Sequence, residues 1–453
     1  KGFRLPGGAT AERDTESLRT TKRYLGSDFA IAGLMIAPTV IAGAKEPADG
    51  STGPTISPLK TARPRRIQVK RRAASTAPVA PEPPEIVTIK YEDLERGEDL
   101  NDAMARAFCE GALGIVIVSG VPGAAAARAR LLPLARQLAK LPKESLERLE
   151  REDTQYCFGW SHGREKFQGV PDLAKASFYA NPLYDDPADG DEEARAKYPF
   201  AAERNVWPSE LPDFEGAFKA MGKLVFDVAA RIVQQCDVLV ASRLNSHGTK
   251  LYDSTFRRSR MVAGRLLHYF PLAASADGKP ANWCGWHNDN STITALVPAM
   301  WINDATGEVV SAPPAGSAGG LYVRSRSGIV VRVSIPANCL AFQIGEAAQI
   351  LSGGILRATP HHVSGHASLP GEPPISRETF ACFIEPQWDA LIGPPQGVQA
   401  EDMFSDEDAE LIPPQRRAQR QWNLGSSSGI PFRSTTVTTA TFSPVRERRS
   451  VPE

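Results

Sequence analysis

The sequence predicts an α+β protein in which a β-barrel core follows an N-terminal αβ cap, with disordered segments at both ends. Short β-branched and apolar runs, separated by turn residues, fill residues 251–395 and predict the strands of the barrel. In residues 85–250, strand-like runs alternate with helix-like patterns, which predicts the cap. Residues 1–84 and 396–453 are rich in small and polar residues, and such segments bury too little apolar area to become ordered.

The composition describes an ordinary soluble protein and excludes several classes. Of the 453 residues 42% are hydrophobic, and 52 Lys and Arg balance 52 Asp and Glu, so no nucleic acid or acidic membrane is predicted as a partner. The six cysteines are scattered without a Cys-x-x-Cys pair. This usage favours a reduced, intracellular compartment and argues against a structural zinc site.

The first 84 residues form a basic leader. Residues 1–80 hold fourteen Lys and Arg against six Asp and Glu, and the run 63–72 is a dense basic cluster. The apolar stretch Phe29–Ala44 is shorter than the roughly 20 residues of a membrane-spanning helix, and Pro38 interrupts it, so no stable membrane insertion is expected. Two interpretations stay open: a targeting segment for an organelle such as a plastid or mitochondrion, or a plain disordered leader of a cytoplasmic protein.

Local patterns predict the individual elements of the cap. Each expectation follows from hydrophobic periodicity or from turn residues at the ends of a run. The expected elements are a strand at Ile86–Ile89, a helical pattern at Asp93–Glu110, a buried strand at Gly114–Pro122, one or two helices at Ala124–Glu152 and a helix pair at Leu211–Asn245. A short helix is also expected in the tail, near Glu401–Leu411.

The core is expected to carry a metal site. Thr292–Val297, Ala341–Gly345 and Glu378–Ile384 read as strands. His287 and Asp289 are two residues apart, so on an extended strand both side chains point into the barrel while Asn288 points away. With a second histidine from another strand they form a two-histidine, one-carboxylate facial triad, the ligand set of non-haem Fe(II).

The second histidine is His361 or His362, because neighbouring strand residues face opposite ways and cannot both coordinate. Periodicity does not choose between them. Arg377 opens an otherwise apolar strand shortly afterwards. It is predicted to pair with a dicarboxylate through its two-pronged guanidinium; the alternative is an ordinary ion pair with a surface carboxylate.

These motifs resemble the non-haem iron, 2-oxoglutarate-dependent dioxygenases, in the branch that includes isopenicillin N synthase. The resemblance spans residues 266–386 and is carried by LHYFP at Leu267–Pro271, HND at His287–Asp289, GLYV at Gly320–Val323, IGE at Ile344–Glu346, ATPH at Ala358–His361 and RET at Arg377–Thr379. It implies that the core is a double-stranded β-helix, a relative of the jelly roll.

The resemblance also implies roles for individual residues. Iron would be bound by His287, Asp289 and His361, with His361 favoured over His362 by the family's Thr-x-His pattern. Arg377 and Thr379 would hold the C5 carboxylate of 2-oxoglutarate, with Thr379 standing where serine is usual. Phe270 stands where many members have a tyrosine that touches this co-substrate.

The activity implied is that of an Fe(II)- and 2-oxoglutarate-dependent dioxygenase. It would use O2 to hydroxylate or desaturate a small-molecule substrate, and would release succinate and CO2. Two rivals remain: an iron-dependent oxidase on the same site that needs no 2-oxoglutarate, and a metal-binding barrel that serves as a non-catalytic scaffold. Specificity in such folds depends on loops, so the motifs leave the substrate open.

Overall fold

A computed structural model of the chain describes most residues between the two ends. The described residues are 85–398 without 165, 168–169, 245–250, 274–281, 313–318, 326 and 369–370, together with 403 and 430–431. All of them belong to the unit Pro78–Glu453. The predictions for the leader lie outside this described part. So do those for the tail and its short helix, except at residues 396–398, at Met403 and at Ile430–Pro431.

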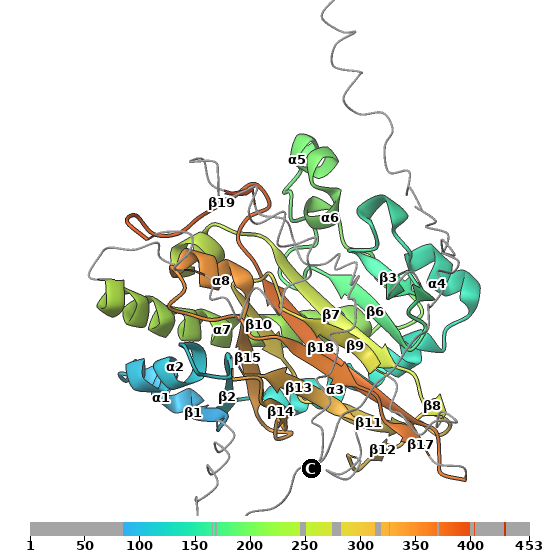
Figure 1. Cartoon of the computed structure of the whole chain (residues 1–453). Coiled ribbons are helices and arrows are strands. Elements are labelled where there is room, and N and C mark those ends of the chain that lie inside the picture. Colours follow the sequence, from blue (N-terminus) through green and yellow to red (C-terminus); the bar gives the residue numbers. More distant parts are fainter. Residues whose placement is uncertain are drawn as a thin grey trace, which may run out of the picture. The chain divides into compact units, whose positions relative to one another are not determined.

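Two main sheets organise the protein (Figure 1). The larger sheet has the order β1-β2-β15-β10-β18-β7-β6-β3, and β11 extends it by pairing with β18 and with β12. Its strands are β1 (Val87–Lys90), β2 (Ile115–Ser119), β3 (Gly159–His162), β6 (Lys175–Ala180), β7 (Val262–Tyr269), β10 (Ile293–Leu296), β11 (Met300–Asn303), β12 (Val309–Val310), β15 (Leu340–Ile344) and β18 (Ile375–Ile384).

The smaller sheet has the order β14-β13-β16-β9, and three two-stranded pairs complete the strands. Its members are β9 (Asn282–His287), β13 (Gly320–Arg324), β14 (Val330–Val333) and β16 (His361–Ser364). The pairs are β4 (Lys166–Phe167) with β5 (Val170–Pro171), β8 (Leu272–Ala273) with β17 (Ala367–Ser368), and β19 (Leu391–Ile392) with β20 (Ile430–Pro431). The predicted mixture of helices and sheets is confirmed, although the described strands form separate sheets and not a closed barrel.

Eight helices accompany these strands in the described part of the chain. They are α1 (Tyr91–Arg96), α2 (Asn101–Phe108), α3 (Ala124–Ala139), α4 (Lys143–Leu149), α5 (Glu192–Lys197), α6 (Pro199–Ala202), α7 (Phe214–Leu244) and α8 (Glu346–Leu351). Short turns of 3-10 and π type lie at Glu152–Thr154 and Asp253–Arg257. The helical pattern at Asp93–Glu110 is divided between α1 and α2, because Gly97 takes a left-handed conformation with φ 69° and ends α1.

The prediction of a helix pair at Leu211–Asn245 is wrong, since α7 is a single helix of 31 residues. Its buried apolar side continues without a break from Phe214 to Val240, and no proline interrupts it. Gly222, a weak helix former, is retained because a Cβ there would lie 2.1 Å from the Cβ of Pro182. Close packing therefore explains the glycine, and the helix runs through it.

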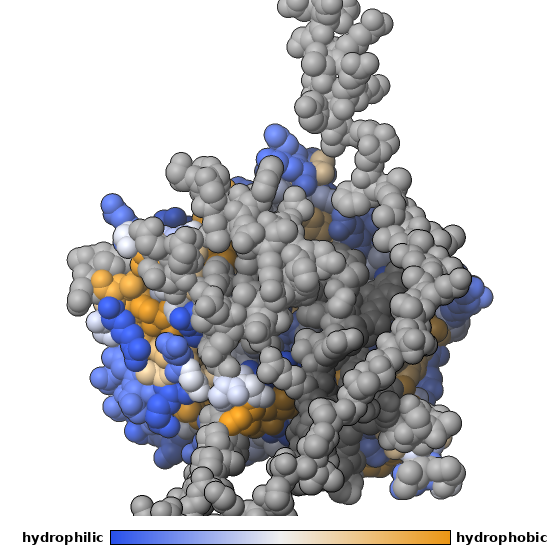
Figure 2. All heavy atoms as spheres, in the orientation of Figure 1, coloured by the Kyte–Doolittle hydropathy of each residue, from blue (hydrophilic) through white to orange (hydrophobic). Residues whose placement is uncertain are grey.

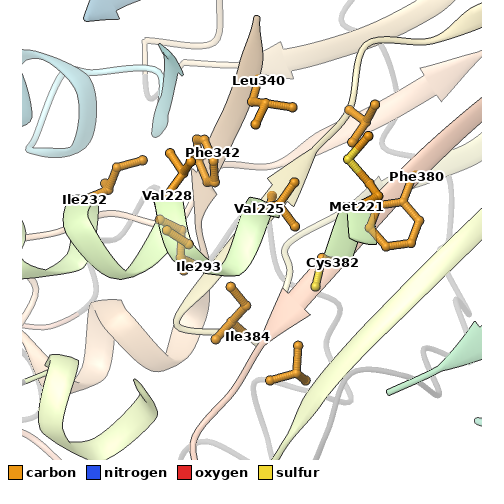
Figure 3. Close-up of a cluster of buried hydrophobic side chains, with 14 of the residues drawn as sticks. Met221, Val225, Val228, Ile232, Ile293, Leu340, Phe342, Phe380, Cys382 and Ile384 are labelled. Atoms are coloured by element: carbon orange, nitrogen blue, oxygen red, sulfur yellow. The ribbon is translucent and has the colours of Figure 1, made fainter. Parts of the chain in front are cut away.

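A hydrophobic core lies between α7 and one face of the larger sheet (Figure 3). Side chains of α7 meet side chains of β10, β15 and β18, and burial of such apolar groups is the main favourable term in folding. The labelled residues in Figure 3 are Met221, Val225, Val228 and Ile232 of α7 with Ile293, Leu340, Phe342, Phe380, Cys382 and Ile384 of the sheet. The residues that alternate with these point to the opposite face.

A second cluster fills that opposite face. It joins Leu267, Tyr269 and Trp301 of the larger sheet to Leu321, Val323 and Val363 of the smaller sheet. We call the face that carries Leu267 and Tyr269 the inner face, because it is turned toward the smaller sheet. The inner face is the one that positions the functional site.

None of the described helices combines the length with the apolar character that crossing a bilayer requires. Figure 2 shows hydrophilic residues gathered over α1 and α2, at the lower left of the view, where Glu92, Glu95 and Arg96 are exposed. These short helices therefore present a charged side to solvent.

Candidate metal centre

Two histidines and one aspartate from separate segments converge in the structure. One ligand atom from each of His287, Asp289 and His361 can be chosen so that all three lie within 4.8 Å of one another. Both histidine Nε2 atoms are 3.7 Å from Asp289 Oδ1. Asp289 Oδ2 is buried and has no hydrogen-bond partner among the described residues. A buried carboxylate with an unused oxygen beside two imidazoles fits a divalent metal such as Fe(II).

The two histidines are neighbours because their strands pair. His287 ends β9, His361 opens β16, and the two residues are partners across the smaller sheet. Their ring centroids are 4.2 Å apart. The sequence therefore brings together residues 74 positions apart (361 minus 287) through ordinary antiparallel pairing.

Asp289 reaches the site from a loop and not from a strand, since β9 ends at His287. The first turn of α8 fixes this loop: the Glu346 backbone N–H donates to the Asp289 carbonyl at 2.7 Å, and Asn288 Nδ2 donates to Glu346 Oε1 at 3.2 Å. At Gly345 a Cβ would lie 2.1 Å from the Ser291 carbonyl oxygen, so only glycine allows this close approach. Asn288 points away from the cluster, as expected.

Burial keeps both imidazoles neutral. It is the main cause that lowers the pKa of His361 to about 4, with the nearby His287 adding to the effect. Burial also lowers the pKa of His287, while Asp289 acts in the opposite direction. His287 Nδ1 lies 2.8 Å from the Gly285 carbonyl oxygen, to which it donates as N–H. This bond leaves the Nε2 lone pair of His287 facing Asp289, as metal coordination requires.

The side-chain amide of Gln343 contacts the imidazole of His361. Gln343 is fully buried on β15, and its amide nitrogen lies 2.8 Å from His361 Nδ1 and 3.1 Å from the Thr359 carbonyl oxygen. Its Oε1 has no partner among the described residues. His361 Nδ1 also lies 3.3 Å from the Thr359 carbonyl oxygen, and donation of its proton to this carbonyl leaves Nε2 of His361 unprotonated for a metal.

We expect Gln343→Leu to weaken Fe(II) binding by about 10- to 100-fold, the usual effect of losing a partner that orients a ligating histidine. The measurement is anaerobic Fe(II) titration. Gln343→Glu is the matched control, because a carboxylate can accept the same Nδ1 proton and should keep most of the affinity. Unchanged affinity in Gln343→Leu would show that the amide does not orient His361.

His362 is directed to the opposite side of the smaller sheet. Its ring centroid is 4.1 Å from that of Trp286 and 5.1 Å from that of Tyr322, with which it stacks. Burial lowers its pKa to about 4. This aromatic packing separates His362 from Asp289 and leaves His361 in the cluster.

Arg377 lies on the inner face of β18, and two of its hydrogen-bond donors have no partner among the described residues. It is 7% exposed, and its guanidinium carbon is 5.0 Å from the ring centroid of Tyr269, its partner on β7. Its Nε and Nη1 are buried and have no hydrogen-bond partner among the described residues. Burial lowers its pKa, and Tyr269 acts in the opposite direction. Unsatisfied buried cation donors are costly, so this environment fits a bound carboxylate.

The other residues expected around the co-substrate differ in their contacts. Thr379 Oγ1 donates to the Val297 carbonyl oxygen at 2.9 Å, so its hydroxyl hydrogen is already used by the backbone. Phe270 packs against His162 and His268, with ring centroids 4.9 and 4.5 Å apart. Tyr269 is the aromatic residue that faces Arg377, and the alignment of β7 with β18 in the folded protein is what brings the two together.

The opposite face of β18 holds a buried acid–imidazole pair. His268 Nδ1 lies 2.9 Å from Glu378 Oε1, and Ser376 Oγ donates to the same oxygen at 2.7 Å. His268 and Glu378 are partners across β7 and β18, and each is at most 1% exposed. Burial raises the pKa of Glu378, while His268 opposes this shift. Positive Arg377 and acidic Glu378 therefore occupy opposite faces of one strand.

Comparison with known proteins agrees with this fold. No family model matches the sequence. The chain is 25% identical over 190 residues to jasmonate-induced oxygenase 4 of Arabidopsis thaliana, which covers 42% of this chain and 45% of the relative. The match thus spans less than half of the curated relative's length. In sequence motifs and fold the chain resembles the 2-oxoglutarate/Fe(II) dioxygenases, so the predicted resemblance is confirmed at this level, while the isopenicillin N synthase-like branch stays a prediction.

Among solved structures, a similar one is a full-length protein of Neurospora crassa in complex with alpha-KG and thymine. It has a TM-score of 0.52 and 20% identity, and the match covers 74% of this chain and 96% of that chain. The complex of the same fungal protein with alpha-KG and 5-formyluracil gives a TM-score of 0.51 at 19% identity, covering 73% and 93%. These similarities show a shared fold.

Proposed function

We propose that this protein is an Fe(II)- and 2-oxoglutarate-dependent dioxygenase that hydroxylates or desaturates a small organic molecule and releases succinate and CO2. One observation carries the proposal: a buried His–Asp–His cluster lies on the same side of the larger sheet as a buried arginine with unsatisfied donors. The arrangement suits a metal next to a dicarboxylate. The proposed core is a double-stranded β-helix, with the two main sheets as its walls.

Each residue has a defined part in this proposal. His287, Asp289 and His361 would hold Fe(II), which supplies O2 activation when bound. Arg377 would pair with the far carboxylate of 2-oxoglutarate and orient it, and the neighbouring Tyr269 ring would help to hold the guanidinium in place. The apolar inner-face residues Leu321, Val323 and Val363 would exclude water from the site.

The test is succinate release from 2-oxoglutarate, with Fe(II), O2 and a panel of small molecules supplied to the full chain. We expect release that requires iron and that a suitable panel member stimulates. Asp289→Ala is the matched blank, since it removes the only carboxylate of the cluster. Oxidation of a panel member without 2-oxoglutarate would replace the proposal by the iron oxidase, and iron binding without any oxidation would favour the scaffold.

A further inference from the structure

The chain after β19, which we call the C-terminal extension, contacts the segments around α8. Its residue Met403 is 1% exposed, and the Met403 backbone carbonyl oxygen accepts two hydrogen bonds. Gln349 Nε2 of α8 donates to this oxygen at 2.8 Å. Arg357 Nη1, in the segment between α8 and β16, donates to it at 2.9 Å. Met403 therefore joins α8 to the segment that leads into β16.

A second contact of the extension lies at the end of α8. Val398 and Pro395 pack closely on Gly353, in the turn that follows the helix. A Cβ at Gly353 would lie 3.1 Å from Val398 Cγ1 and 3.3 Å from Pro395 Cδ. The extension is thus fitted against the α8 region at two places, one by close packing and one by hydrogen bonds.

The helix that receives these contacts also holds the segments that carry two of the candidate ligands. At its first turn, the Glu346 backbone N–H donates to the Asp289 carbonyl at 2.7 Å. Near its end, Gln349 Oε1 accepts a hydrogen bond from the Ala358 backbone N–H at 2.8 Å, three residues before His361. One short helix therefore connects the loop of Asp289 with the segment of His361.

Gln349 is the residue through which Met403 reaches the ligand segments. It is 2% exposed, and both ends of its amide are used, Nε2 on Met403 and Oε1 on Ala358. A buried amide that loses a partner costs free energy, so the side chain is expected to shift when Met403 moves away. Such a shift would also disturb the bond to Ala358 and, with it, the approach to His361.

We infer that Met403 is a positioning residue of the metal centre. Its carbonyl, bound by Gln349 and Arg357, keeps α8 and the segment before β16 at the spacing that brings Asp289 and His361 together. The inference rests on the proposed function and gives the C-terminal extension a part in it.

The experiment loosens Met403 in the full-length chain and measures iron binding. Met403→Gly removes the buried side chain and gives the backbone more freedom, so Fe(II) should bind about tenfold more weakly, as for residues that orient a ligand. Met403→Leu should bind Fe(II) like the wild type, because leucine keeps the apolar volume. Anaerobic Fe(II) titration well below the melting temperature measures both.

Two more readouts distinguish positioning from a general loosening of the fold. In metal-free protein, hydrogen exchange around Ala358 should be faster in Met403→Gly than in the wild type or in Met403→Leu, because the bond to Gln349 protects this amide. In iron-saturated protein, the 2-oxoglutarate affinity should stay unchanged, since Arg377 lies on β18 and not on the segments that Met403 joins.

Asn181→Leu is the matched control for lost stability. Asn181 is also a buried amide that bridges backbone groups: its Oδ1 accepts from the N–H groups of Leu183 and Tyr184 at 3.0 Å, and its Nδ2 donates to the Arg260 carbonyl at 2.7 Å. None of these groups belongs to α8 or to the ligand segments. Asn181→Leu should lower the melting temperature and leave the Fe(II) affinity unchanged, whereas Gln349→Leu should lower both.

The outcomes separate this inference from the proposed function. If Met403→Gly binds Fe(II) like the wild type, Met403 does not position the ligands and the dioxygenase stands. An equal loss of Fe(II) affinity in Asn181→Leu would attribute the effect to stability and would also overturn the inference. If the wild-type protein binds no Fe(II) but exchange around Ala358 still responds to Met403→Gly, the proposed function fails and the role of Met403 in holding these segments stands.

Discussion

His361→Ala should bind Fe(II) more than about 100-fold more weakly than the wild-type protein and should have no dioxygenase activity. The side chain is one of three candidate ligands that the described residues bring together. Losing a ligand should weaken Fe(II) binding more than the 10- to 100-fold typical of losing a residue that orients a ligand. His287→Ala and Asp289→Ala are expected to behave alike. Anaerobic Fe(II) titration measures the affinity, and circular dichroism verifies that the variants fold.

His362→Ala is the matched control for this experiment. It removes the side chain of the neighbouring histidine, whose ring stacks on Tyr322 on the other side of the smaller sheet. Iron affinity should therefore stay close to that of the wild type. Loss of iron in His362→Ala together with normal binding in His361→Ala would mean that the ligand is His362 and that the register of β16 is off by one.

Arg377→Ala should weaken the apparent affinity for 2-oxoglutarate by about one and a half to three and a half decades (powers of ten). Fe(II) binding should stay nearly intact. Removing one partner of a desolvated charge pair costs roughly 2–5 kcal/mol, at 1.4 kcal/mol per tenfold. Two buried donors of Arg377 have no partner among the described residues, which supports the expectation that it binds an anion. The measurement is anaerobic titration of the Fe(II) protein with 2-oxoglutarate, followed by its charge-transfer absorption.

Two further variants refine this second expectation. Arg377→Lys should recover only part of the affinity, because a single ammonium cannot replace the two-pronged contact. Thr379→Ala should change 2-oxoglutarate binding little and instead cost about 1 kcal/mol of folding stability, since its hydroxyl bonds the Val297 carbonyl. If Arg377→Ala binds 2-oxoglutarate like the wild type, the arginine has another role. That result would favour the alternative function, an iron-dependent oxidase that needs no 2-oxoglutarate.

Sequence patterns predicted those parts of the molecule that depend on neighbours along the chain. Thr292–Val297 and Ala341–Gly345 correspond to β10 and β15, because β-branched and apolar runs bounded by turn residues specify strands locally. The composition of α7 did not distinguish one helix from two, since the packing of Pro182 on Gly222 is a tertiary contact. The cluster of His287, Asp289 and His361 was recognisable because residue type and order both follow a known pattern.

Residues whose neighbours depend on how two strands align were harder to predict. Tyr269 was missed because its position beside Arg377 depends on how β7 and β18 align, which no local pattern determines. Gln343 was missed for a similar reason: β15 and the Thr359–His361 segment meet only in the folded protein. Asp289 was expected on a strand, whereas the first turn of α8 holds it in a loop.

The opposite charges on β18 have a consequence for folding. A slip of one residue against β7 would turn Glu378 toward the metal ligands and press Arg377 into the layer where α3 packs on β18. Glu378 would then lose its contact with His268, and breaking a buried pair costs about 3–5 kcal/mol. Misaligned chains are thereby penalised at a strand that carries part of the candidate site, so Glu378, which faces away from that site, selects the alignment that puts Arg377 into it.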